Sequence, residues 1–153
     1  MSDDFRDFTD DLVGRMQAKR KDDKLRSEKA LHDASLLKKG FNDLGEQAIQ
    51  SMGSLCNSIN NNLGVGVRLI CTQSGQGIEV GRVDVPEKLQ VNCYADKGTI
   101  EFVVVQSGTT TYRQIYHPKL DKTDTSYYFV DSAGSSITVN QMCMKAMDAY
   151  LGV

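Results

Sequence analysis

Apolar residues recur at helical spacing along the first 61 residues of the chain and at strand spacing after that. Between residues 37 and 59, successive apolar positions are separated by three or four residues, close to the helical period of about 3.6. A strict heptad would require apolar residues at Ser51 and Ser58, so a long left-handed coiled coil is disfavoured. The pattern predicts a helix over 30–61, and its apolar positions are Leu37, Phe41, Leu44, Ala48, Met52, Leu55 and Ile59.

Three glycines interrupt this predicted helix, and each interior glycine costs about 0.5–1 kcal/mol relative to alanine. Gly40 and Gly45 flank the apolar stripe, where a missing side chain lets a sheet or a neighbouring helix come close. Gly53 falls away from the stripe, and the sequence supplies no packing reason for it.

Residues 1–29 form a separate amphipathic segment. Phe5, Phe8, Leu12 and Met16 stand at i, i+3, i+7 and i+11, which places them on one helix face. Residues 1–11 carry five Asp and one Arg, whereas residues 15–29 carry seven Lys or Arg against three Asp or Glu. We expect a partly disordered or projecting arm over 1–29, followed by one α+β domain over 30–153. The arm is either a solvated helix or a docking helix whose stripe enters a groove on a partner.

After Gly64 the apolar period changes to two, which is typical of β-strands. Glycine-containing breaks separate the strands, and their short lengths require antiparallel neighbours. The predicted fold class is therefore α+β: a long N-terminal helix, an antiparallel β-meander of about six strands and a C-terminal helix, with the helices packed on one sheet face. The predicted strands are 65–73, 77–85, 88–96, 99–106, 110–117 and 126–132, and 118–125 is read as a longer loop.

Alternation within these strands separates the two faces of the sheet. One set is apolar and should face the helices: Ile78, Val80, Leu89, Val91, Cys93, Ile100, Phe102 and Val104. The other face is mixed, with apolar residues among charged and polar ones. On that second face Tyr94, Glu101 and Arg113 are candidate ligand-binding residues, because a carboxylate, a guanidinium and a phenol can together bind a polar ligand.

The last helix has a clear local start signal. Thr138 and Gln141 are spaced as a capping box, and Ile137 and Met142 are spaced as a hydrophobic staple. The helix should end near Leu151, before Gly152.

The length of 153 residues fits one domain. The formal net charge of -2 supplies no general attraction to nucleic acid, and acidic residues beside the basic segment would repel phosphate. No apolar run approaches the roughly 20 residues of a membrane span. The acidic first residues are unlike a secretory signal peptide. We expect a cytoplasmic protein with no membrane or nucleic-acid partner.

Motifs for catalysis, phosphate binding and metal binding are missing from the sequence. Cys56, Cys71, Cys93 and Cys143 lack zinc-type spacing, and each lies in an apolar segment, so we expect reduced, buried thiols. A nucleophilic cysteine paired with His32 or His117 is an alternative without local support. We therefore predict no catalytic residue, no cofactor and no metal.

The length of the predicted helix points to a partner. From residue 30 to 61 it would be roughly 48 Å long, whereas six strands make a sheet only about 24–29 Å wide. The apolar residues Leu31, Ala34 and Leu37 would then overhang and need a cover. We expect a homodimer or a chaperone-like adaptor that binds protein partners through its N-terminal helix. The alternative is a small-ligand-binding domain, or a weak enzyme, with a pocket between helix and sheet.

Overall fold

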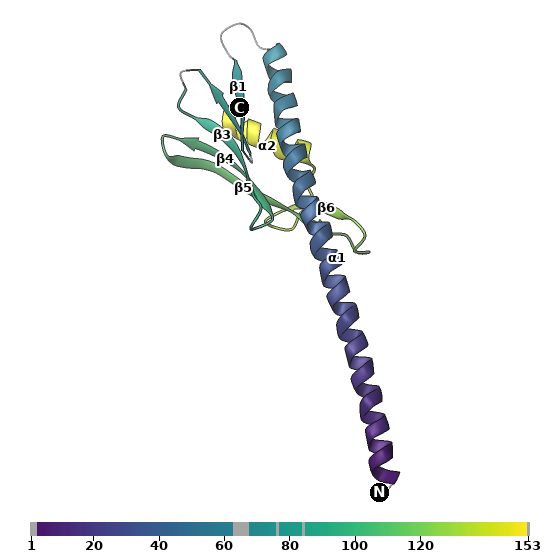
Figure 1. Ribbon diagram of the computed structural model, residues 1–153. Helices are drawn as coiled ribbons and strands as arrows, with labels where there is room; N and C mark the ends of the chain where they lie inside the picture. The colour runs from purple at the N-terminus through teal and green to yellow at the C-terminus, as the bar shows by residue number, and fades with distance from the viewer. Residues whose placement is uncertain (1–2, 63–67, 76, 84, 153) are drawn as a thin grey trace. The chain divides into compact units, whose positions relative to one another are not determined.

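The computed structural model describes residues 3–62, 68–75, 77–83 and 85–152. Along the chain a long helix is followed by strands and then by a second helix (Figure 1). The elements are α1 (Asp3–Asn62), β1 (Leu69–Ser74), β2 (Gly77–Arg82), β3 (Lys88–Tyr94), β4 (Thr99–Gln106), β5 (Thr109–Leu120), β6 (Tyr127–Asp131) and α2 (Val139–Leu151).

The chain divides into two compact units, Met1–Ser35 and Leu36–Val153, which we call the N-terminal unit and the C-terminal unit. Helix α1 contributes residues to both. The domain boundary expected at residue 29 stays a prediction.

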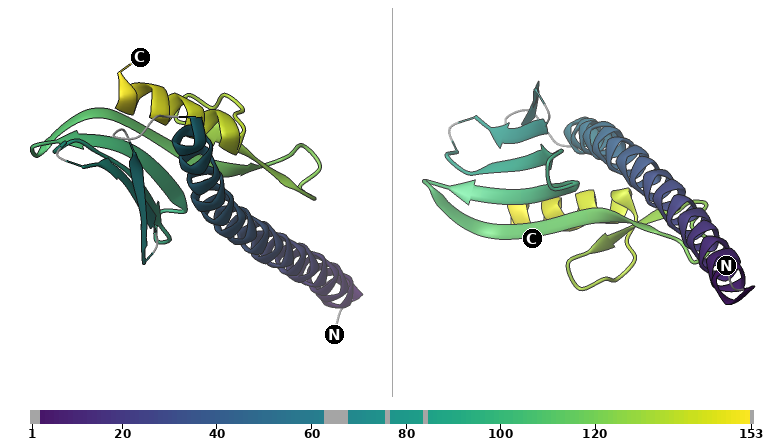
Figure 2. Two further views of the ribbon diagram at one scale, coloured as in Figure 1. Left: turned by 90° about the horizontal axis from the view of Figure 1, so that it is seen from above. Right: turned by 60° about the horizontal axis from the view of Figure 1, so that its bottom comes forward.

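The six strands form one antiparallel sheet in the order β1-β2-β3-β4-β5-β6. Its apolar face is the predicted one: Ile78 pairs with Val91, and Val91 pairs with Phe102. Seven of the eight expected inward residues are buried, and Cys93 is half-buried. Helix α2 lies across one face of the twisted sheet (Figure 2). The predicted α+β architecture is confirmed.

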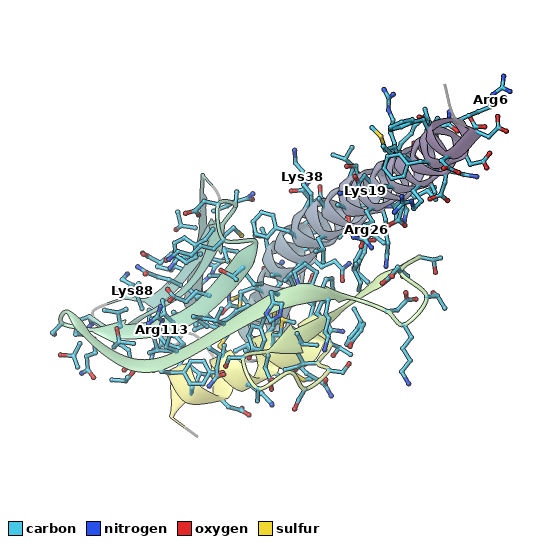
Figure 3. The ribbon with its side chains drawn as sticks, turned by 90° about the horizontal axis from the view of Figure 1, so that it is seen from below. Arg6, Lys19, Arg26, Lys38, Lys88 and Arg113 are labelled. Atoms are coloured by element: carbon cyan, nitrogen blue, oxygen red, sulfur yellow. The ribbon has the colours of Figure 1, made fainter. Side chains whose placement is uncertain are left out.

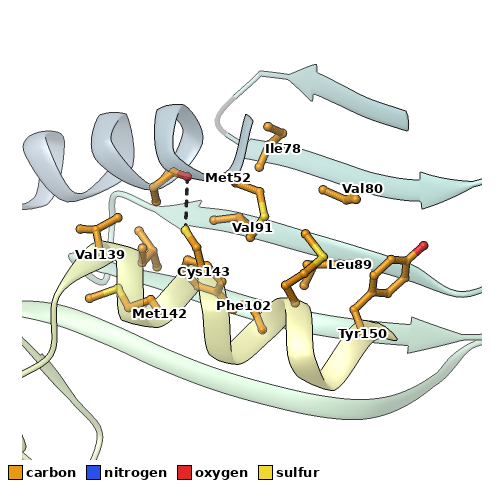
Figure 4. Packing of buried hydrophobic residues seen from close by; sticks show 14 of the residues in the cluster. Met52, Ile78, Val80, Leu89, Val91, Phe102, Val139, Met142, Cys143 and Tyr150 are labelled. Carbon is orange, nitrogen blue, oxygen red and sulfur yellow. Dashed lines mark hydrogen bonds between the residues drawn. The ribbon is translucent and has the colours of Figure 1, made fainter. Parts of the chain in front are cut away.

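Both helices supply side chains to one core against this face (Figure 4). Met52 of α1 and Cys143 of α2 are both buried there, and the Cys143 thiol donates to the Ala48 carbonyl at 3.9 Å. Within the sheet layer, the rings of Phe102 and Tyr116 meet edge to face, with centroids 5.5 Å apart. Packing of both helices on the same sheet face is therefore as the periodicity predicted.

The glycines of α1 differ in what surrounds them. A Cβ on Gly40 would stand 2.9 Å from Pro118 Cβ and 3.0 Å from Tyr127 Cγ, so the close approach expected there is present. A Cβ on Gly45 would stand 3.4 Å from Cys93 Sγ, at the edge of ordinary van der Waals contact. A Cβ on Gly53 would meet nothing within 4 Å.

Helix α2 begins and ends where its sequence signals stand. Gln141 N–H donates to the Thr138 hydroxyl, and Thr138 N–H donates to the Gln141 side chain, which completes the capping box. Gly152 ends the helix with φ 70°, a left-handed conformation that glycine adopts at little cost.

The structure differs from the sequence prediction at several element ends. Helix α1 begins at Asp3 rather than at 30, and no proline lies between these positions to break it. Strand β5 continues to Leu120 through Pro118, so residues 118–120 are not loop. Proline is tolerated there because β4 pairing stops at Tyr116, which leaves β6 as the one neighbour. Strand β2 ends at Arg82, and residues 65–67 of the first predicted strand lie outside the described residues.

Candidate functional site

The three candidate ligand-binding residues lie together on the sheet face opposite the helices. Arg113 Nε donates to Glu101 Oε2 at 2.5 Å, and the Tyr94 hydroxyl donates to Glu101 Oε1 at 3.3 Å. Glu101 is buried, with 7% of its surface exposed. Burial, and after it the Glu101 carboxylate, raises the pKa of Tyr94. The three side chains lie close together because β3, β4 and β5, which carry them, are consecutive neighbours in the sheet.

Within this cluster, both carboxylate oxygens of Glu101 accept from protein donors. A buried carboxylate needs such partners to offset its lost hydration. The arrangement therefore accounts for cohesion between β3, β4 and β5.

A groove of about 660 Å³ lies between α1 and the sheet within the C-terminal unit. The apolar part of its lining comes from Leu37, Phe41, Ala95 and Pro118, and further lining residues are Asn42, Gly98 and Thr99. The cationic or titratable groups that line it are Lys38, Lys97 and His117, and among the residues that the structure describes no carboxylate lines it.

Three segments far apart in sequence build the groove, which is why sequence reasoning found only Leu37. Helix α1 supplies one wall, the β3–β4 hairpin supplies Lys97, and β5 supplies His117. Lys97 Nζ also stands 5.4 Å from the centre of the Tyr94 ring, which holds this lysine at the hairpin. Lys38 projects from α1 as a labelled side chain in Figure 3.

The predicted partner-binding residues of the N-terminal unit are solvent-exposed. The exposed fractions are 65% for Phe5, 59% for Phe8 and 62% for Met16, and Leu12 is exposed as well. Of the three residues expected to overhang, Leu31 and Ala34 are exposed, whereas Leu37 is half-buried and lines the groove. Four large apolar side chains on one helix face are thus in contact with water.

Charges in the N-terminal unit are segregated along the helix. Asp3, Asp4, Asp7, Asp10 and Asp11 stand near its start with Arg6, and the basic residues follow. Arg6, Lys19 and Arg26 are labelled on this helix in Figure 3. Ion pairs of 3.1 Å join Arg15 to Asp11 and Arg26 to Asp22 across one helical turn. Because both pairs are exposed, each contributes little to stability.

The cysteines follow the expectation with one exception. Cys56 and Cys143 are buried and Cys93 is half-buried, but Cys71 is exposed, so the expectation of burial is wrong for Cys71. Its place on β1, at the end of the sheet order, leaves it in reach of water. Burial raises the pKa of Cys56 and of Cys143 to about 12, which makes both thiols poor nucleophiles near neutral pH. Among the described residues, no group of His, Cys, Asp and Glu is arranged to hold a metal ion.

No family model matches the chain, and neither the curated proteins nor the solved structures contain a match. Within the part of the chain that the structure describes, no helix has the length and apolarity to cross a membrane.

Proposed function

We propose that this protein is a non-catalytic protein-interaction module that binds other protein chains through its N-terminal helix. The observation that carries the proposal is the stripe of Phe5, Phe8, Leu12 and Met16, which is exposed on described, helical residues. As a homodimer or a chaperone-like adaptor, such a protein would use the helix as its docking element. We predict that the protein is located in the cytoplasm.

The spacing of the stripe suits docking into a groove. Anchors at i, i+3 and i+7 are the usual pattern of an amphipathic helix bound by a partner. Aromatic anchors also dominate the affinity of many interfaces. Each large apolar side chain that becomes fully covered contributes about 1.5–3 kcal/mol. Four such residues can therefore offset the cost of association for a complex of moderate affinity.

The alternative of an unpartnered solvated helix has a thermodynamic cost. Isolated helices depend on propensity alone and are marginal in water. A partner that covers the stripe would stabilise the helix and shield its phenylalanines. Leu31 and Ala34 add exposed apolar surface in the same unit, which is consistent with the proposed homodimer.

The Tyr94, Glu101 and Arg113 cluster favours a structural role over catalysis. Its groups satisfy each other, whereas a general acid or base has to reach a substrate proton. We therefore assign no catalytic residue.

The test compares the full chain with a stripe variant, Phe5→Ser together with Phe8→Ser. Lys21→Ala, on the same helix but off the stripe, is the matched control. We expect affinity capture from the native host to recover a protein with the wild type and the control, and to lose it with the stripe variant. If all three chains capture the same proteins, the helix is not the docking element.

A second candidate function is binding of a small ligand in the groove. The observation that favours it is the groove of about 660 Å³ with an apolar lining and two lysines, a volume within the usual range of ligand sites. The lining suits an apolar molecule with an anionic group, so dodecanoate is a suitable probe. Saturable calorimetric binding that is lost in Phe41→Asp would support this candidate.

A further inference from the structure

The groove of the C-terminal unit and the start of the N-terminal helix have complementary chemistry. In the groove, Leu37, Phe41 and Pro118 supply apolar surface, while Lys38 and Lys97 supply positive charge. The helix over residues 3–12 carries five Asp and one Arg beside its apolar anchors. An acidic amphipathic helix is the type of ligand that such a groove should bind.

We propose that the groove of one copy binds the helix of residues 3–16 from a second copy of the chain. Phe5, Phe8 and Leu12 would lie on the apolar floor, and the neighbouring aspartates would face the two lysines. This inference rests on the proposed function, since it uses the same docking stripe, and it adds the identity of the partner and its receptor site.

Reciprocal exchange explains why the partner should be a second copy. Each copy has one acidic helix and one groove. In a two-fold dimer, the helix of each copy can therefore occupy the groove of the other. If each phenylalanine buries roughly 150 Å², the two phenylalanines and their receptor bury roughly 600 Å² per groove. Two grooves then bury roughly 1,200 Å², at the lower limit of the range of specific, stable interfaces.

Volume and polarity also fit this occupant. A groove of about 660 Å³ is within the range that holds a compact apolar ligand, which suits a few large side chains. Within the described part of the chain, the groove lining contains no carboxylate that would repel the aspartates. Apart from Arg6, the basic residues of the N-terminal unit begin at Arg15, beyond the three anchors, so the groove would receive the predominantly acidic part.

The first experiment is a charge exchange in the full chain, measured by sedimentation velocity over a concentration series. The rim variant Lys38→Glu with Lys97→Glu, and the helix variant Asp4→Lys with Asp7→Lys, should each raise the dimer dissociation constant at least about 10-fold. The chain that carries all four changes should regain most of the lost affinity. Lys122→Glu, in an exposed loop, is the control and should leave the dimer dissociation constant of the wild type unchanged. Circular dichroism checks the folding of every variant.

The second experiment identifies which chain occupies the groove. A photoreactive benzoylphenylalanine replaces Phe8, and equal amounts of heavy-isotope and normal chains are mixed before illumination. We expect crosslinks from position 8 to groove segments 37–42 or 95–99, with half of them joining heavy to normal chains. Crosslinks only within single chains would overturn the second copy as occupant. A monomeric wild type, or a dimer unaffected by both reversals, would also overturn the proposal.

Failure of this inference is distinguishable from failure of the proposed function. If the wild type is monomeric but still captures another protein in a stripe-dependent way, the inference fails and the interaction function stands. If substitution of Phe5 and Phe8 changes neither self-association nor capture, both fail. Displacement of the helix crosslink by dodecanoate would show that a small ligand can compete for the groove.

Discussion

Substitution of Gly40 by alanine isolates the contact that brings helix α1 onto the strands. The new methyl carbon would stand 2.9 Å from Pro118 Cβ and 3.0 Å from Tyr127 Cγ, whereas unstrained carbon contacts lie at about 3.5–4.0 Å. Neither neighbour can move freely. Pro118 is held in β5, and the Tyr127 hydroxyl donates to Asp43, one turn further along the helix.

Two opposing effects determine how much Gly40→Ala changes the free energy of unfolding. Replacing an interior helical glycine by alanine gains about 1 kcal/mol, while overpacking of this kind costs about 1–3 kcal/mol. The difference between the two terms predicts that Gly40→Ala lowers the free energy of unfolding by up to about 2 kcal/mol. Gly53→Ala is the matched control, because a Cβ added there would meet nothing within 4 Å. It should raise the free energy of unfolding by about 0.5–1 kcal/mol.

The assay is urea unfolding followed by far-ultraviolet circular dichroism at one fixed protein concentration, since self-association would shift apparent stability. The prediction requires a lower free energy of unfolding for Gly40→Ala than for Gly53→Ala. If Gly40→Ala stabilises the protein as much as Gly53→Ala, the close contact with Pro118 and Tyr127 does not exist in solution.

Three further predictions concern the cap, the buried ion pair and the thiols, all measured by urea unfolding. Thr138→Ala should lower the free energy of unfolding by about 1 kcal/mol, whereas Thr138→Ser keeps a hydroxyl that can cap the helix. If the two variants have equal free energies of unfolding, the capping box does not contribute to stability. Arg113→Ala leaves the buried Glu101 without its 2.5 Å partner and should cost about 1–2 kcal/mol, reduced by the exposure of Arg113, with a smaller loss in Arg113→Lys; a change below about 0.5 kcal/mol would contradict this. Burial raises the pKa of Cys56 and Cys143 from 9.0 to about 12, so the unfolded chain releases these protons first as the pH rises. Stability should therefore be complete below pH 9 and fall progressively toward pH 12, with a loss near pH 10 on the order of 1 kcal/mol for each thiol; a slope of stability against pH that is unchanged in the double alanine variant would refute this origin.

Much of the architecture follows from local sequence signals. The change from helix α1 to the strands follows from the change of apolar period, because side-chain direction repeats every 3.6 residues in a helix and every two in a strand. The meander follows from short connections, which only antiparallel neighbours allow. The cap of α2 needs only Thr138 and Gln141, three residues apart.

The sheet faces were also predictable, and with them the cluster of Tyr94, Glu101 and Arg113. Alternation placed these residues on one face, and consecutive strand pairing brought them together. Their hydrogen bond depends on the register of β3 against β4. Their ion pair depends on the register of β4 against β5, which includes a shift between Val104 and Val105. A one-residue shift reverses the face of the side chains beyond it, so only the structure could decide these contacts.

The groove and the reason for Gly40 belong to the tertiary structure alone. The groove joins α1, the β3–β4 hairpin and β5, and Gly40 faces a tyrosine that lies 87 positions later in the sequence (127 − 40). No periodic pattern encodes such meetings, because they depend on how distant segments pack together. The sequence by itself determined the type and order of the elements and which sheet face is apolar. Packing decided where those faces leave a groove, and therefore what could bind there.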